Sequence, residues 1–224
     1  MTEDRRERAE RILDAAADLL LRHGYRRVTV EDVAEHAGVG KGTLYLHWKT
    51  REQLFLAVML REAARSIEDL TQAFEDDPEL TLLHRMTRTQ FLNVVRRPLL
   101  HAPYLADSGV LGKLAAKLHD NQDPRHHEAF LDYLRSQAEH GLIRTDLKVE
   151  DLATAYQAVL HGFLLAPAAA DPEAAAGLLA DTVARAFQPT ASPPASKVRA
   201  AAPDAIALFR ATAEIDRANL RRAY

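Results

Sequence analysis

Three Asp-Pro pairs constrain the fold of this chain more than any other feature. In Asp77-Pro78, Asp123-Pro124 and Asp171-Pro172, a short carboxylate directly precedes a proline. Such an aspartate caps the free N–H groups that begin a helix, and a proline at the first helical position loses no hydrogen bond. Apolar residues recur at helical spacing elsewhere, and no alternating run of β-branched and aromatic residues is long enough for a strand. The sequence therefore predicts an all-α protein.

Signals for helix starts and ends divide the chain further. Glycine or proline follows most apolar-periodic runs, as is typical of helix C-termini. The expected helices are residues 4–23, 30–37, 41–47, 51–75, 78–97, 105–120, 124–140, 149–166, 172–188 and 204–222. The stretch 189–196, rich in Pro, Ser and Ala, is expected to be a linker. We predict three parts: an N-terminal domain over 1–50, a helical domain over 51–188, and a linker with a basic helix over 189–224.

Composition and charge narrow the function classes. The chain has no cysteine, which excludes disulfides and thiolate chemistry and fits a reducing compartment. It has no long apolar run, and its first residues are too charged for a secretory signal, so we expect a cytoplasmic protein without a membrane span. Net charge is −3 overall, zero over 1–50, −6 over 51–190 and +3 over 191–224. Any contact with nucleic acid must therefore come from a locally arranged face.

Residues 29–49 carry the most specific pattern. Thr29 with Asp32 three residues later forms a capping box that begins a short helix. Gly38 follows where a tight turn needs positive φ, and a second short helix carries Leu44 and Trp48 on one side. Two short helices joined by such a turn and anchored by apolar side chains predict a helix-turn-helix.

The second short helix has an unusual outer face. On a helical wheel Gly42, Thr43, Tyr45 and Leu46 point outward, where a surface helix would normally be charged. Such a face suits the major groove of DNA, where glycine permits close approach and leucine can meet a thymine methyl. Four side chains are placed to flank it at phosphates: Lys41, Tyr45, His47 and Lys49. The alternative is that Tyr45 and Leu46 simply pack on the first helix.

The stretch from Ile12 through Leu54 resembles the DNA-binding domain of the TetR/AcrR family of tetracycline-repressor-like regulators. The matching residues are Ala15-Ala16, Leu19-Leu20, Gly24-Tyr25, Thr29-Val30, Val33-Ala34, Ala37-Gly38-Val39, Lys41-Gly42-Thr43-Leu44-Tyr45, Trp48 and Leu54. The resemblance implies a three-helix DNA-binding domain followed by a helical domain for ligand binding and dimerisation. It also implies a homodimeric transcriptional repressor that binds double-stranded DNA and that a small-molecule inducer releases from the DNA.

The resemblance further implies roles for single residues. It places phosphate contacts at Thr29, Tyr45 and Lys49, and it places Lys41, Gly42 and Thr43 at bases or backbone. We include Gly40 in the expected DNA-binding set, although this family often has a helix-capping serine there and glycine caps less well. Leu46 occupies a position that is often polar, so the base preference is not implied.

Two apolar stripes indicate a dimer interface on helices 149–166 and 172–188. Two such helices from each subunit would close a four-helix bundle, a choice that also follows the family resemblance. The expected interface residues are Leu152, Tyr156, Val159, Leu160, Phe163, Leu178, Leu179, Val183 and Phe187. The alternative is that both stripes face the protomer's own core. Because two-fold symmetry in the protein is matched by half-sites in DNA, a dimer predicts a pseudo-palindromic operator.

A ligand cavity is expected among the helices of 51–166. Large apolar side chains occur there together with scattered His, Tyr and Arg, a mixture that suits an amphiphilic or aromatic guest. The expected lining residues are Met59, His84, Met86, Arg88, Phe91, Tyr104, Phe130, Tyr133 and Tyr156.

Residue spacing argues against a nucleotide-binding loop, a metal site and a catalytic site. The sequence around Gly40-Lys41 has Glu35 where a phosphate-binding P-loop requires glycine. His119, His126 and His127 near Asp120 and Asp123 lack convergent geometry, so no metal or cofactor is expected. No catalytic arrangement can be argued, and we predict that the chain is not an enzyme. The competing hypothesis is an all-α interaction protein that uses its helix-turn-helix for packing only.

The C-terminal helix is basic and has an apolar side that carries Ile206, Phe209, Ala213 and Leu220. Its charge is opposite to that of the middle of the chain, so we expect it to dock on the body or on a partner subunit. The alternative is a mobile arm that contacts DNA phosphates without reading sequence.

Overall fold

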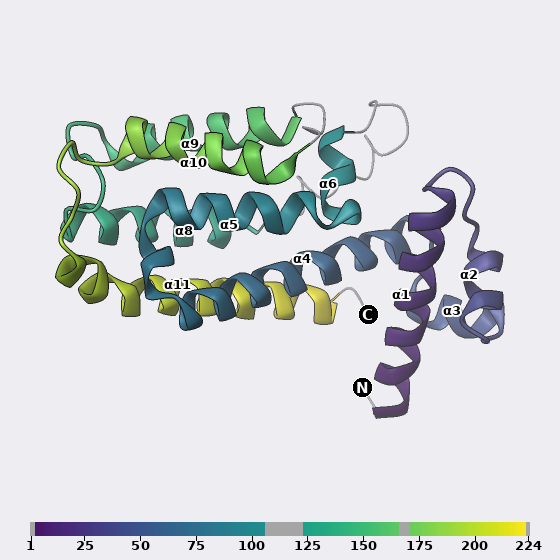
Figure 1. Cartoon of the computed structure of the whole chain (residues 1–224). Helices are drawn as coiled ribbons and strands as arrows, with labels where there is room; N and C mark the ends of the chain where they lie inside the picture. Colours follow the sequence, from purple (N-terminus) through teal and green to yellow (C-terminus); the bar gives the residue numbers. More distant parts are fainter. Residues whose placement is uncertain (1–2, 106–122, 166–170, 223–224) are drawn as a thin grey trace. The chain divides into compact units, whose positions relative to one another are not determined.

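The computed structural model describes residues 3–105, 123–165 and 171–222 (Figure 1). Within these ranges the chain forms helices and no strand, which confirms the predicted all-α fold. The elements are α1 (Glu3–His23), α2 (Val30–His36), α3 (Lys41–His47), α4 (Arg51–Asp76), the 3-10 helix η1 (Pro78–Thr81), α5 (Leu83–Val95), α6 (Pro98–Leu105), α8 (Pro124–Glu139), α9 (Val149–Leu165), α10 (Pro172–Phe187) and α11 (Ala195–Arg222).

The described chain divides into two compact units. The first holds residues 3–64, 98–105 and 216–222, and the second holds residues 65–97, 123–165 and 171–215. In the first unit, apolar side chains from α1, α2, α3 and the start of α4 form one buried core. Its fully buried members include Ile12, Leu13, Val33, Leu44, Trp48, Leu54 and Phe55.

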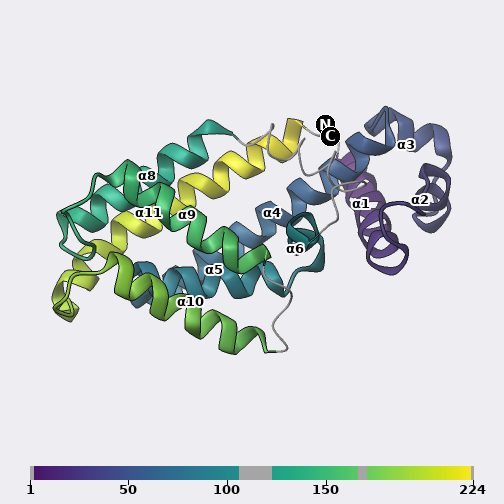
Figure 2. The ribbon, with the colours of Figure 1, turned by 90° about the horizontal axis from the view of Figure 1, so that it is seen from above.

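The second unit is a helical bundle. Figure 1 shows α9 and α10 in one tier, α5 and α8 in the next, and α11 beside the C-terminal half of α4. Figure 2 gives the same neighbours from above, with α10 along α5 and α8 along α11. The helix contacts agree, because α10 packs against both α5 and α9, and α8 packs against α9. The unit thus buries at least one face of each of its long helices.

The C-terminal helix α11 is part of this bundle. The Phe209 ring stacks on Phe74 of α4 with centroids 4.5 Å apart, and it meets the Tyr133 ring of α8 edge-on at 6.0 Å. Farther along α11, Val198 and Ala201 pack with Leu142 in a small buried cluster. The residues 195–215 therefore dock on the body of the same chain, as expected for the docking alternative.

The expected helix over 78–97 is interrupted. Asp77 caps the turn as predicted, because its Oδ1 accepts from the Glu79 N–H at 3.0 Å. The turn is a short 3-10 helix, however, and Leu82 then takes an extended conformation before α5 begins. The carbonyl of Thr81, the last residue of this turn, accepts a hydrogen bond from the buried Tyr133 hydroxyl at 2.8 Å. A tertiary partner for this carbonyl explains why one continuous helix does not form.

Two other boundaries differ from expectation. Pro98, expected to end a helix, begins α6, because proline at a first helical position loses no hydrogen bond. Most of the expected helix over 105–120 lies outside the described residues. The tail helix α11 begins at Ala195 rather than at 204, which shortens the expected linker, and Pro203 lies in its interior. Pro203 is exposed, so water can bond the backbone carbonyl that its missing N–H leaves free.

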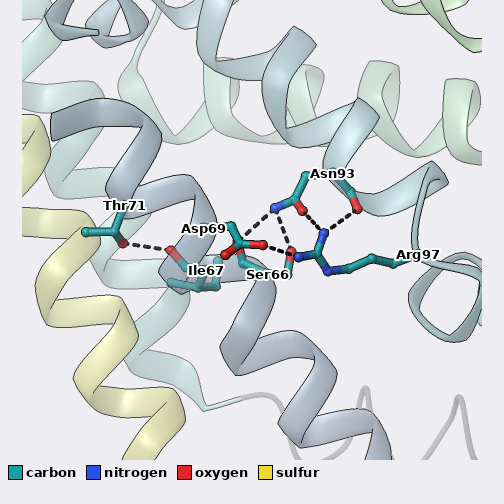
Figure 3. A network of polar contacts seen from close by, with 6 residues as sticks. All are labelled: Ser66, Ile67, Asp69, Thr71, Asn93 and Arg97. Atoms are coloured by element: carbon teal, nitrogen blue, oxygen red, sulfur yellow. Dashed lines mark hydrogen bonds and ion pairs between the residues drawn. The ribbon is translucent and has the colours of Figure 1, made fainter. Parts of the chain in front are cut away.

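A polar network joins α4 to α5 inside the second unit (Figure 3). The Asn93 amide nitrogen donates to the backbone carbonyl of Ser66 at 2.8 Å and to its hydroxyl at 2.9 Å. The Arg97 guanidinium in turn bonds the side-chain oxygen of Asn93 and pairs with Asp69. The last turn of α5 is therefore tied to the middle of α4 by directional bonds as well as by packing.

Candidate DNA-binding site

The helix α2 begins with the predicted capping box. The Asp32 N–H donates to Thr29 Oγ1 at 3.2 Å, and the Thr29 N–H donates to Asp32 Oδ2 at 2.8 Å. After α2 the chain turns at Gly38, whose φ of 65° lies in the left-handed region that favours glycine. The capping box begins α2 and the turn at Gly38 leads into α3, so the two helices form the predicted helix-turn-helix.

The helix α3 buries one side and exposes the other. Leu44 and Trp48 are 0% and 1% exposed in the core of the first unit. On the opposite side Gly42 is exposed, and Leu46 is 66% exposed although it is a large apolar residue. A Cβ built on Gly42 meets no atom of this chain within 4 Å, so nothing inside the protein requires glycine there.

Charged and aromatic groups border this exposed face. The Lys41 ammonium pairs with Glu31 of α2 and lies 5.8 Å from the centroid of the Tyr45 ring. Tyr45 is half-buried against the core, as the packing alternative expected, whereas Leu46 is not. Lys49 is exposed, and its ammonium donates to the Tyr45 carbonyl at 3.1 Å. The hydrogen bond between Lys41 and Glu31 lowers the pKa of the Glu31 carboxyl and raises the pKa of the Lys41 ammonium.

The structure corrects the expectation for His47. Its side chain is buried and stacks on Trp48 with ring centroids 5.2 Å apart, so it does not flank the exposed face. Burial lowers the pKa of His47, and the positive charges of Arg5 and Arg8 lower it further. The wheel placed His47 at the border of the face, but at the end of a short helix a bulky neighbour such as Trp48 decides burial.

Comparison with known proteins adds the decisive observation. Residues 12–58 match the family described as "Bacterial regulatory proteins, tetR family". The chain is 27% identical over 158 residues to the HTH-type transcriptional repressor AcnR of Corynebacterium efficiens, covering 69% of this chain and 79% of that protein. The chain thus carries a DNA-binding domain of the TetR family over residues 12–58. Together with the relatives, this match identifies it as a DNA-binding transcriptional regulator rather than an enzyme.

Solved structures share the fold of this TetR-family chain. A TetR-family regulator from a Rhodococcus species aligns with a TM-score of 0.61 at 24% identity, covering 79% of this chain and 96% of that one. FadR of Bacillus subtilis, solved in complex with stearoyl-CoA, aligns with a TM-score of 0.59 at 18% identity, covering 78% and 96%. Both alignments include a helical C-terminal domain after the helix-turn-helix, which confirms the predicted fold class.

The residues expected to line a ligand cavity do not all lie together in this TetR-family protein. Met59 is buried in the core of the first unit, and Tyr104 of α6 also belongs to that unit. Arg88 is exposed and pairs with Glu173 at the start of α10, so it does not face the interior. Periodicity showed that these residues lie on helices but could not show which helices pack together. The remaining six lie in the second unit: His84, Met86, Phe91, Phe130, Tyr133 and Tyr156.

Tyr156 is central to the aromatic cluster of the second unit. Its ring lies 5.1 Å from that of Phe130 and 6.3 Å from that of Phe187. Its hydroxyl lies 3.1 Å from Thr87 Oγ1 and donates to Gln90 Oε1 at 3.3 Å, while burial raises its pKa. The cluster therefore combines aromatic surface with hydrogen-bonding groups that are uncharged at neutral pH.

The structure also corrects the expected dimer interface. Five of the nine residues are buried in the protomer's own core, as the alternative for the two stripes expected: Leu152, Tyr156, Leu179, Val183 and Phe187. Val159, Leu160 and Phe163 are half-buried, and only Leu178 is prominently exposed, at 61%. An apolar stripe locates the buried side of a helix but does not distinguish a core neighbour from a partner subunit.

Two residues beside α3 were missed by the sequence analysis. Glu31 forms an ion pair with Lys41, and Arg5 of α1 donates a hydrogen bond to the Leu46 carbonyl at 3.4 Å. Neither pairing is visible in the sequence, because the partners are 10 and 41 positions apart on different helices.

Within the described residues no group of three or more His, Asp or Glu side chains could hold a metal, and no helix there has the length and apolar character needed to cross a bilayer. His119 and Asp120 lie outside those residues.

Because the pKa of His47 is lowered in the folded protein, we expect the stability of this domain to depend on pH. An unfolded histidine has a pKa of about 6.5, so below that pH the unfolded chain binds a proton that the folded chain resists. We expect the melting temperature to fall as pH decreases from about 7 to 5, and His47→Gln to reduce this fall. Thermal unfolding followed by circular dichroism at several pH values measures it. His84, whose pKa is also lowered by burial, leaves a residual dependence in the variant. If the melting temperature of His47→Gln falls with decreasing pH as steeply as that of the wild type, His47 is not the group responsible.

Proposed function

We propose that this protein is a homodimeric repressor that binds a pseudo-palindromic DNA operator in the cytoplasm and is released by a small-molecule ligand. The observation that carries the proposal is the outer face of α3, where Gly42 leaves open space and Leu46 projects into solvent. We assign DNA binding to residues 1–50, ligand binding and dimerisation to 51–188, and no DNA contact to 189–224.

The DNA contacts divide into two groups. Gly42, Thr43 and Leu46 meet base edges in the major groove, since they occupy the exposed side of a helix whose other side is anchored. Phosphates are bound beside the groove by Thr29, Tyr45 and Lys49. Lys41 joins them once a phosphate competes with Glu31, and Gly40 brings the backbone at the start of α3 near the DNA. We leave His47 out of the set because it is buried.

The experiment selects duplexes from a randomised pool with the wild-type protein and measures binding to the selected duplex by fluorescence anisotropy. Gly42→Ala adds only a methyl group to open space, so it is expected to keep or raise the melting temperature while weakening binding about tenfold or more. Lys49→Ala should weaken binding to every duplex alike. Leu46→Ala should change base preference by about 1–3 kcal/mol at one position.

Lys148→Ala, a matched loss of an exposed charge in the second unit, serves as the control and should bind like the wild type. If the wild type retains no duplex, the proposed function is wrong and the helix-turn-helix is used for packing. Wild-type affinity in Gly42→Ala and Lys49→Ala together would remove α3 from the interface.

The homodimer is proposed from the exposed sides of α9 and α10. Ala155, Ala158 and Gly162 follow one another along α9 at helical spacing, and all three are exposed. On α10 the exposed side carries Gly177 and Leu178. Small residues allow helices to approach closely, so these sides suit a bundle with the same helices of a second subunit. This surface replaces the buried residues of the sequence-based expectation.

Leu178→Glu is expected to convert the dimer to monomer, because a carboxylate would be buried without a partner at the interface. Light scattering after size exclusion at micromolar concentration measures the mass. Leu147→Glu places the same charge at another exposed leucine of the second unit and should leave the mass unchanged. A wild-type protein that is monomeric under these conditions excludes the dimer, and with it the palindromic operator.

The ligand site is proposed at the aromatic cluster around Tyr156. Its uncharged hydroxyl and amide groups, with the rings of Phe130 and Phe187, suit an amphiphilic or aromatic molecule. FadR of Bacillus subtilis was solved with an acyl-CoA. A ligand releases DNA if it favours a conformation that cannot bind the operator, and a coupling of about 1–3 kcal/mol is sufficient.

A further inference from the structure

The N-terminal half of α1 carries four arginines, Arg5, Arg6, Arg8 and Arg11, in a segment whose acidic residues balance them in number. The sequence therefore shows no basic patch here. In the structure Arg5 lies next to the end of α3, whereas Glu10 and Asp14 lie on a different side of the helix, beside Arg61.

Carboxylates are neutralised on the side of α1 that meets α4. The guanidinium of Arg61 lies 3.1 Å from Glu10 and 2.9 Å from Asp14, and its side chain is only 3% exposed. Glu10 and Asp14 are one helical turn apart, so both face Arg61. Two carboxylates of α1 are thereby turned toward Arg61, whose one positive charge they share.

Arginines occupy the side of α1 that meets the end of α3. Arg5 Nη2 donates to the Leu46 carbonyl at 3.4 Å. The positive charges of Arg5 and Arg8 are both close enough to the buried His47 to lower its pKa. Arg5 is exposed and Arg8 is half-exposed, and no carboxylate of the described chain forms an ion pair with either. Glu7 lies two positions after Arg5 and so points about 160° away around the helix.

Of the two lysines in and just after α3, one is already neutralised. The Lys41 ammonium is paired with Glu31, whereas the Lys49 ammonium donates only to the neutral Tyr45 carbonyl and keeps its charge. A helix lying in the major groove has phosphates along both of its borders, and these need cations that are not already neutralised. The two arginines of α1 meet this requirement at the C-terminal end of α3.

We propose that Arg5 and Arg8 form a second phosphate-binding surface, which grips the DNA backbone beside the end of α3 and contributes affinity without reading sequence. This inference rests on the proposed DNA binding through α3. It explains how a segment with zero net charge can bind a polyanion, since two carboxylates of α1 are turned toward Arg61 while Arg5 and Arg8 form no ion pair within the described residues.

The test uses the full-length protein and two 30-base-pair duplexes, one selected by the wild type from a randomised pool and one of scrambled sequence. Affinity is measured by fluorescence anisotropy over a series of KCl concentrations. For Arg5→Ala with Arg8→Ala, the slope of log affinity against log salt should become shallower by about 2, because each lost phosphate contact removes about 0.9. Both duplexes should weaken by the same factor.

Two further variants separate this inference from simpler effects. Arg22→Ala removes one charge from the other end of α1, about 25 Å away along the helix, and should leave the slope unchanged. Arg5→Lys retains the charge and should retain the slope, provided that the melting temperature confirms folding. An unchanged slope in the double variant, or an equal change per charge in Arg22→Ala, overturns the inference while wild-type binding stands. If the wild type binds neither duplex, the proposed function fails first.

Discussion

A chain that ends at Thr190 is expected to melt about 6–20 °C lower than the full-length protein. Removing α11 uncovers Phe74 and Leu142, which are buried beneath Phe209 and Val198 in the second unit. Re-exposing this apolar surface costs about 3–5 kcal/mol, and for a chain of this size each kcal/mol shifts the melting temperature by about 2–4 °C. Thermal unfolding by circular dichroism measures the shift.

Point variants locate the effect within α11. Phe209→Ala should lower the free energy of unfolding by about 2–3 kcal/mol, because the half-buried ring stacks on Phe74. Arg210→Ala removes the exposed ion pair with Glu75 and should cost less than about 1 kcal/mol. The truncated chain should retain the salt dependence of DNA binding. A shallower salt slope at unchanged stability would instead identify the tail as an arm that contacts phosphates.

Trp48→Ala is expected to destabilise the first unit by about 3–5 kcal/mol and to abolish DNA binding. The indole is 1% exposed and packs beneath α3, so its removal leaves a cavity under the helix that is proposed to contact DNA. Urea unfolding followed by far-UV circular dichroism measures the loss, because the variant lacks the chain's one tryptophan as a fluorophore.

Leu46→Ala is the matched control for this prediction, since it shortens an apolar side chain on the exposed side of the same helix. Its stability should stay within about 0.5 kcal/mol of the wild type. Equal destabilisation by the two substitutions would contradict the orientation of α3 described above. A Trp48→Ala protein that binds DNA as well as the wild type would show that the position of α3 does not depend on this core.

Local capping chemistry made most of the fold predictable. The carboxylates of Asp77, Asp123 and Asp171 accept backbone hydrogen bonds as their Asp-Pro pairs indicated. Where tertiary contacts compete, local rules failed. The Thr81 carbonyl bonds Tyr133, which lies 52 positions away, and this partner could not be read from the sequence.

The candidate DNA-binding face was predictable for a related reason. Leu44 and Trp48 on one side and Leu46 on the other follow from helical periodicity alone. The predicted interface residues show the limit of that reasoning. Leu179 and Val183 are apolar and correctly spaced, yet they are buried among the helices of their own protomer. Periodicity defines which side of a helix is covered, but the partner that covers it depends on how distant segments pack.

The network of Ser66, Asp69, Asn93 and Arg97 has a consequence for induction (Figure 3). A guest molecule that slides α5 along α4 must first break bonds from Asn93 and Arg97, each worth about 0.5–1.5 kcal/mol net. Weak binders then occupy the site without moving the helices, and only those whose affinity differs enough between the two arrangements act as inducers. In the proposed mechanism of induction, these four side chains would thus set a threshold between ligand occupancy and release of DNA.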